Sequence, residues 1–269
     1  MGWFSKKRAA DSPLSAPEGA RGPARDSEHE AVASAAASPD PGVARLVQRW
    51  DALIADVQAR LDQVLAQATA QSEALLPSLG TDLGPHSRIW SATEARYHEH
   101  TEEVSDGWDA ISDELSELDG CTEAVMDREG NKRDRANTEL EIRYTRAYRQ
   151  AMARAAEQMR QKVQGDPDGM RIFSASGALM LGQWEGQGAW EAMKRIENRI
   201  NAHHDRKDVP LELLRELEST SRQYWTTTLS VEARHAPEQQ QYLQAKIDRY
   251  MHDVEKTLRQ YWQWRQQGG

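Results

Sequence analysis

Six large apolar side chains recur at strict intervals of seven residues in the middle of this 269-residue chain. Seven residues are close to two helical turns, so these side chains fall on one narrow stripe of a helix. A stripe of this width can pack against one or two other helices, but it cannot form the wall of a large globular core. The spacing therefore predicts coiled-coil packing. The six residues are Trp90, Tyr97, Val104, Ile111, Leu118 and Val125.

The charge along this central stretch changes sign at Gly130–Asn131. Residues 99–127 include eleven carboxylates and no Lys or Arg, whereas residues 128–162 include ten basic and five acidic side chains. Because Gly and Asn both tolerate a left-handed backbone, we predict an antiparallel hairpin that folds back here, with its acidic flank beside its basic flank. Two alternatives are open. Asp119–Gly120 is a second candidate for the break, and a helix continuous through Gly130 would pair its acidic half with the basic half of another chain.

A second strong helical pattern precedes this stretch, from Val43 to Leu76, and ends at Pro77. Its apolar residues follow alternating steps of four and three, which is typical of a heptad seam. The predicted seam is Val43, Val47, Trp50, Ile54, Val57, Leu61, Val64, Ala68, Gln71 and Leu75.

These patterns predict an all-α protein, an elongated helical bundle with a coiled-coil hairpin and a disordered N-terminal tail. We place the tail at residues 1–42, because this segment holds five of the ten prolines and is otherwise rich in Ala, Ser, Gly and charge. Coiled-coil helices are placed at 43–164 and a C-terminal helical bundle at 170–269. Only 42 residues, about 16%, are Leu, Ile, Val or Phe, which fits narrow seams better than a thick core.

Composition and motifs argue against several classes of function. The net charge of −9 disfavours general nucleic-acid binding, and no run approaches the roughly 18 apolar residues of a membrane span. Cys121 is the single cysteine, so no internal disulfide can form and a reducing compartment is indicated. The series Asp127, Glu129, Asn131 resembles a calcium loop, but Lys132 stands where that loop needs Gly. We therefore predict a cytoplasmic non-enzyme with no catalytic, cofactor-binding or metal-binding residues.

Two aromatic clusters are predicted to bind partners. The first lies at the start of the chain beside basic residues, a combination that can dock weakly on the inner surface of an anionic membrane. The second lies near the end of the chain and is too dense for a solvated helix end, so it should pack on the bundle or on a protein partner. The predicted partner-binding residues are Trp3, Phe4, Lys6, Lys7, Tyr261, Trp262 and Trp264.

Three hypotheses for function follow. The first is a non-enzymatic coiled-coil scaffold or adaptor that acts through helix–helix interactions with protein partners and with copies of itself. The second is a helical-bundle ligand-binding protein or enzyme with a site near Gly177–Trp190, where glycines interrupt the helical pattern and a short β-hairpin is an alternative. The third is a regulator that mimics nucleic acid through its acidic helix, provided that the basic helix beside it does not neutralise that charge.

Overall fold

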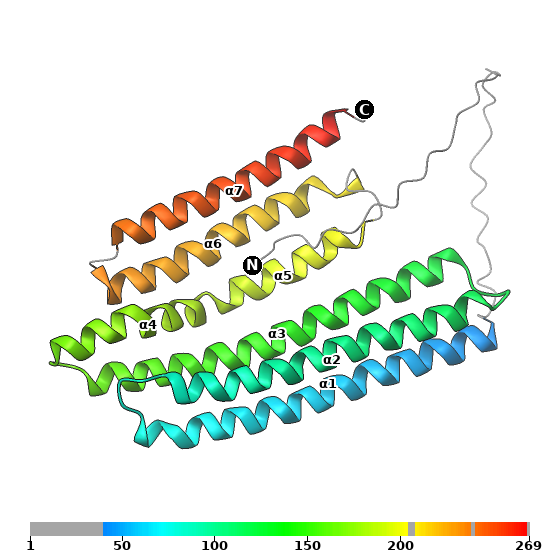
Figure 1. Cartoon of the computed structure of the whole chain (residues 1–269). Coiled ribbons are helices and arrows are strands. Elements are labelled where there is room, and N and C mark those ends of the chain that lie inside the picture. Colours follow the sequence, from blue (N-terminus) through cyan, green and yellow to red (C-terminus); the bar gives the residue numbers. More distant parts are fainter. Residues whose placement is uncertain (1–39, 204–207, 238–239, 268–269) are drawn as a thin grey trace. The chain divides into compact units, whose positions relative to one another are not determined.

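The computed structural model describes residues 40–203, 208–237 and 240–267 (Figure 1). These residues form seven α-helices and one short 3-10 helix, and they include no strand. The predicted all-α helical bundle is therefore confirmed. Residues 1–39 of the predicted tail lie outside the described ranges. In chain order the helices are α1 (Pro41–Leu75), η1 (Leu76–Ser78), α2 (Gly84–Ser116), α3 (Glu123–Lys162), α4 (Pro167–Glu185), α5 (Gln187–Asn201), α6 (Leu211–His235) and α7 (Gln240–Gln267).

Short polar side chains define the starts of three helices. The Asp40 carboxylate accepts hydrogen bonds from the first backbone N–H groups of α1, at 2.7 Å from the nitrogen of Gly42. The Thr122 hydroxyl caps α3 and the Asp166 carboxylate caps α4 in the same way. Such caps satisfy backbone donors that have no partner within the helix. They are local signals, which is why most helices fall where the residue pattern predicts them.

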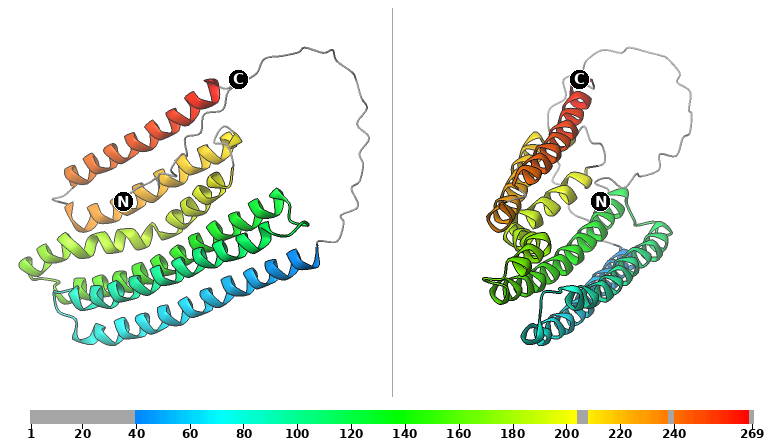
Figure 2. Two further views of the ribbon diagram at one scale, coloured as in Figure 1. Left: turned by 45° about the vertical axis from the view of Figure 1, so that its right-hand side comes forward. Right: turned by 60° about the vertical axis from the view of Figure 1, so that its left-hand side comes forward.

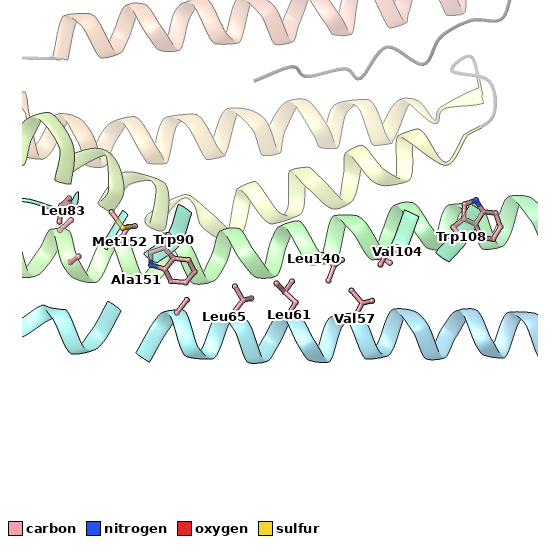
Figure 3. Packing of buried hydrophobic residues seen from close by; sticks show 14 of the residues in the cluster. Val57, Leu61, Leu65, Leu83, Trp90, Val104, Trp108, Leu140, Ala151 and Met152 are labelled. Carbon is pink, nitrogen blue, oxygen red and sulfur yellow. The ribbon is translucent and has the colours of Figure 1, made fainter. Parts of the chain in front are cut away.

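Helices α1, α2 and α3 form a three-helix bundle in which each helix contacts the other two. The chain reverses direction after α1 and again after α2, so α1 and α3 are parallel and α2 is antiparallel to both (Figures 1 and 2). Trp50 of α1 lies against Trp108 of α2, with ring centroids 5.7 Å apart. Figure 3 shows side chains of α1 pointing toward the other two helices. The residues labelled there are Val57, Leu61, Leu65, Leu83, Trp90, Val104, Trp108, Leu140, Ala151 and Met152.

The seam of α1 departs from the predicted heptads in its second half. The structure buries Leu65 and Ser72, whereas Gln71, which the heptad pattern places in the seam, is exposed and Val64 is only half-buried. A straight helix drifts by about 20° per heptad, so four heptads shift the inward face by almost one residue position. Beyond Leu61 the predicted seam is therefore correct at Ala68, which is buried, and wrong at Gln71.

A ladder of ion pairs between α1 and α3 repeats every eleven residues, a period longer than a heptad. Its three rungs are eleven residues apart on each helix, and the partners in every rung differ by 81 in residue number. A constant difference requires two parallel helices in register, and an eleven-residue period stays close to that of a straight helix. The rungs are Asp51–Lys132 at 2.7 Å, Asp62–Arg143 at 2.5 Å, and Glu73–Arg154.

The hairpin turn lies at residues 117–122, not at Gly130–Asn131. Helix α3 continues through Gly130, so the predicted turn is wrong and the alternative break at Asp119–Gly120 is correct. A β-carbon added at Gly130 would lie 3.4 Å from the Trp108 ring of α2. That is an ordinary van der Waals distance, so Gly130 lies against the Trp108 ring within a regular helix, and the backbone does not use its freedom to turn.

Helices α4 to α7 continue from the other side of α3. Helix α4 packs on α3 and α6, α5 packs on α3 and α6, and α7 packs on α6 (Figure 2). The short β-hairpin considered near residue 175 is wrong, because residues 167–185 form α4. Gly182 explains the close fit there: a β-carbon at this position would collide with the backbone carbonyl oxygen of Thr228 in α6.

Candidate partner-binding surface

Five carboxylates form a single stripe along the outer face of α2. They are spaced by four, three, four and four residues, a pattern that keeps them within a narrow arc of the helix. All five are exposed. The stripe lies opposite the buried seam that contains Val104 and Ile111. We call this stripe the α2 acidic face, and its residues are Glu102, Asp106, Asp109, Asp113 and Glu117.

The α2 acidic face differs from Glu99, Glu103 and Glu114 of α2 in having no cation within ion-pair distance among the described residues. Glu103 accepts a hydrogen bond from Arg60 of α1 at 2.6 Å, and Glu114 accepts one from Arg49 at 2.8 Å. In contrast, none of the ion pairs between described residues includes a member of the α2 acidic face. These five charges therefore have no ion-pair partner within the described part of the chain.

The basic helix α3 does not neutralise α2. Its cations bind carboxylates of α1 in the ladder described above and carboxylates of α5, such as the Arg146–Glu191 pair at 2.5 Å. Over residues 40–203, 208–237 and 240–267, no ion pair joins α2 to α3. The predicted pairing of the acidic flank with the basic flank is therefore wrong, because the paired cations of α3 bind carboxylates of α1, of α5 or of α3 itself.

Aromatic rings replace charge pairs at the contact between α2 and α3. The rings of Tyr97 and Tyr144 stack with centroids 4.9 Å apart and an interplanar angle of 11°. Trp90 packs edge-on against Tyr144 and Tyr148, at 6.3 and 5.9 Å. Burial raises the pKa of Tyr97 and the pKa of Tyr144, so both phenols stay neutral at any physiological pH. The contact supplies stability without using the α2 carboxylates.

An open groove runs between α2 and α3 at the edge of the α2 acidic face. It has a volume of about 360 Å³ and shares Glu102 and Asp106 with that face. Three of its lining residues, Glu102, Asp106 and Glu141, are carboxylates. Carboxylate oxygens accept hydrogen bonds and suit the donors of Lys and Arg side chains. Its lining residues are Tyr97, Thr101, Glu102, Ser105, Asp106, Asn137, Thr138 and Glu141.

Of the residues predicted to bind partners from the sequence, Trp3, Phe4, Lys6 and Lys7 lie outside the described residues. Tyr261 and Trp264 belong to α7, but their side chains are also outside what the structure describes. Trp262 is 41% exposed near the end of α7. A role for these residues in binding stays a prediction.

The polar groups around Gly177–Trp190 hold α5 against α3. Arg149 of α3 is buried, donates a hydrogen bond to Gln187 at 2.9 Å, and lies 4.7 Å from the centroid of the Trp190 ring. Gln187 donates in turn to Glu191 at 3.1 Å, and Glu191 is also bound by Arg146. A cation between an aromatic ring and hydrogen-bond acceptors is a stabilising arrangement. The Glu191 carboxylate of this region is thus engaged in packing.

The α2 acidic face was missed at the level of individual residues, although its total charge is obvious from the sequence. Eleven carboxylates in 99–127 do not reveal which of them are free. Phasing the acidic residues against the apolar seam would have identified the stripe, because its members lie opposite that seam. Only the tertiary structure shows that Glu103 and Glu114 have partners on α1.

Comparison of the chain with protein-family models, with curated proteins and with solved structures finds no match. Among the helices that the structure describes, none is long and apolar enough to cross a membrane. Function is therefore inferred from the surface chemistry of the chain itself.

Proposed function

We propose that this protein is a non-enzymatic helical scaffold or adaptor that binds a basic protein segment along the α2 acidic face. One observation carries the proposal: five exposed carboxylates share one helix face and lack partners, while neighbouring carboxylates on the same helix are paired. A continuous row of one charge attracts a partner of opposite charge and sets its orientation. Like charge repels nucleic acid from the same face.

The partner expected is a helix or extended segment with Lys or Arg at intervals of three and four residues. Its cations would lie along the stripe, and one of them would enter the groove beside Glu102 and Asp106. Exposed ion pairs contribute only about 0.5 kcal/mol each and weaken in salt. Such a partner would therefore bind reversibly, as suits an adaptor. The lone cysteine, Cys121, fits a reducing compartment such as the cytoplasm.

The test measures binding of a fluorescently labelled lysine-rich helical peptide by anisotropy. Three neutral substitutions, D106N/D109N/D113N, should weaken binding about tenfold, because three pairs of about 0.5 kcal/mol amount to about 1.5 kcal/mol. The matched control is E185Q/D208N/E212Q, which changes the net charge equally at exposed positions away from α2. The control should bind within a factor of about two of the unmodified chain.

Two results would count against the proposal. Absence of binding at low ionic strength would reject it outright. An equal loss in both triple variants would mean that the peptide responds to overall net charge, and the α2 acidic face would then have no special role.

A further inference from the structure

The solvent-exposed face of α7 carries a row of basic side chains. Arg249, His252, Lys256 and Arg259 follow steps of three, four and three, and Lys246 extends the row by three residues toward the start of the helix. All five are exposed. This spacing places them on one side of the helix. We call this row the α7 basic face.

The opposite side of α7 provides its attachment to the bundle. Met251 and Leu258 are each 8% exposed and lie toward α6. One ion pair, Arg222–Glu255 at 3.2 Å, adds to this contact. Lys246, at the start of the α7 basic face, also acts on α6, because burial raises the pKa of the Glu232 carboxyl there and the charge of Lys246 lowers it by a smaller amount. Among the members of the α7 basic face, only Arg259 has a carboxylate within ion-pair distance in the described structure, and that distance is 3.7 Å.

We infer that the α2 acidic face binds the α7 basic face of a second copy of this chain. This inference rests on the proposed function and names the partner. The two rows match in charge and in length: Glu102 to Glu117 spans about 22 Å of helix, and Lys246 to Arg259 spans about 20 Å. Both follow steps of three and four, so two helices lying side by side bring cations against carboxylates along the whole contact.

An exposed aromatic side chain adds apolar area to this contact. Tyr242 is 68% exposed one helical turn before Lys246, and it is the most exposed large apolar side chain in the described part of the molecule. Aromatic residues next to a charged row are typical of protein interfaces. On the facing copy, the groove beside Tyr97 is lined by acceptors and an aromatic ring. It can accept the Tyr242 side chain or one of the basic side chains next to it.

The positions of α2 and α7 require two copies. They lie toward opposite edges of the described helices, separated by α3, α4, α5 and α6 (Figures 1 and 2). A chain therefore cannot join its own two faces. Each copy offers one acidic and one basic face, so the contact is heterologous and repeats into a ring or an open string of copies. Assembly should grow with protein concentration and fall with salt.

Charge reversal on the full chain provides the test. Sedimentation velocity should show assemblies at about 0.05 M NaCl and monomers at about 0.5 M NaCl. The higher salt concentration shortens the Debye length from about 14 Å to about 4 Å and so weakens the contact between charges. The variants D106K/D109K/D113K and R249E/K256E/R259E should each raise the dissociation constant at least tenfold. Combining both sets in one chain should restore assembly, and so should mixing the two single-face variants. The control E185K/D208K/E212K, matched in charge to the first variant, should assemble like the unmodified chain.

Several outcomes would overturn the inference. One is an unmodified chain that stays monomeric at low salt, and another is a combined variant that assembles no better than its two parents. If either of these results is found but the lysine-rich peptide still binds the α2 acidic face, the proposed function stands and the basic partner is a different protein. If vesicles containing phosphatidylserine bind the unmodified monomer but not R249E/K256E/R259E, the α7 basic face belongs to a lipid surface. Circular dichroism melting of every variant separates loss of contact from loss of fold.

Discussion

A buried hydrogen bond between α1 and α2 permits a sharp test of the three-helix bundle. Ser72 Oγ lies 2.8 Å from His86 Nδ1, and the two residues are 2% and 0% exposed. The other ring nitrogen, Nε2, is buried without a partner. Whichever nitrogen carries the proton, one polar atom of the ring is left unsatisfied. Replacing Ser72 alone adds a second unsatisfied group, and replacing His86 alone exchanges the unsatisfied ring nitrogen for an unsatisfied hydroxyl. Replacing both removes all of them.

The magnitudes follow from this count. S72A should lower the free energy of unfolding by about 1–2 kcal/mol, because it leaves both His86 nitrogens without partners. H86L should cost about 1 kcal/mol, since it strands the Ser72 hydroxyl but removes the unsatisfied ring nitrogen. The double variant S72A/H86L should be about as stable as the unmodified chain. The double-mutant cycle of Ser72 and His86 therefore predicts a coupling energy of about 2 kcal/mol between the two side chains.

The same histidine should make stability depend on pH. Burial lowers the pKa of His86. It is also the main reason why the pKa of His100 on the same helix is lowered. Above about pH 6.5 both are neutral in the folded and unfolded chain. As the pH falls below that value, the unfolded chain binds protons that the folded chain does not, so stability falls by up to about 1.4 kcal/mol per pH unit for each histidine. This loss ends below the folded pKa values.

Urea unfolding followed by circular dichroism, at about pH 7.5 and about pH 5.5, measures both effects. H86L should lose less stability on acidification than the unmodified chain does, whereas H98Q, on the exposed side of α2, should lose the same amount. Strictly additive effects of S72A and H86L would refute the hydrogen-bond argument. An unchanged pH dependence in H86L would refute the buried neutral state of His86.

Two further predictions concern packing and charge. Gly182→Val should lower the free energy of unfolding by about 1–3 kcal/mol, because the new side chain collides with the Thr228 carbonyl oxygen. Gly188→Ala, whose β-carbon meets open space, should raise the free energy of unfolding by up to about 1 kcal/mol. Equal effects of the two substitutions in urea unfolding would contradict the α4–α6 contact. Neutralising the α1 side of the ladder in D51N/D62N/E73Q should cost about 1–2 kcal/mol at low salt. A cost that does not shrink in about 1 M NaCl would show that these pairs are not electrostatic in origin.

Much of the helical content could be predicted because its signals are local. The repeat of apolar residues along 43–76 and 90–118, the prolines at 77, 167, 210 and 237, and the caps at Asp40 and Thr122 each act within a few residues. Hydrogen bonds of a helix also join near neighbours. The class of fold and most of the helices follow from these signals without reference to the rest of the molecule.

The partners of each helix face could not be predicted, since they depend on residues far away in the chain. Gly130 permits a turn or a continuous helix, and in the folded chain it lies within α3 against the Trp108 ring of α2. Ser72 replaces Gln71 in the seam because the straight helix drifts against a heptad over its full length. The α2 acidic face has no ion pair among the described residues because it lies opposite the buried seam of α2, while Asp51, Asp62 and Glu191 bind three of the cations of α3. Charge and periodicity are properties of one segment, whereas pairing is a competition among all segments, and only the folded chain decides it.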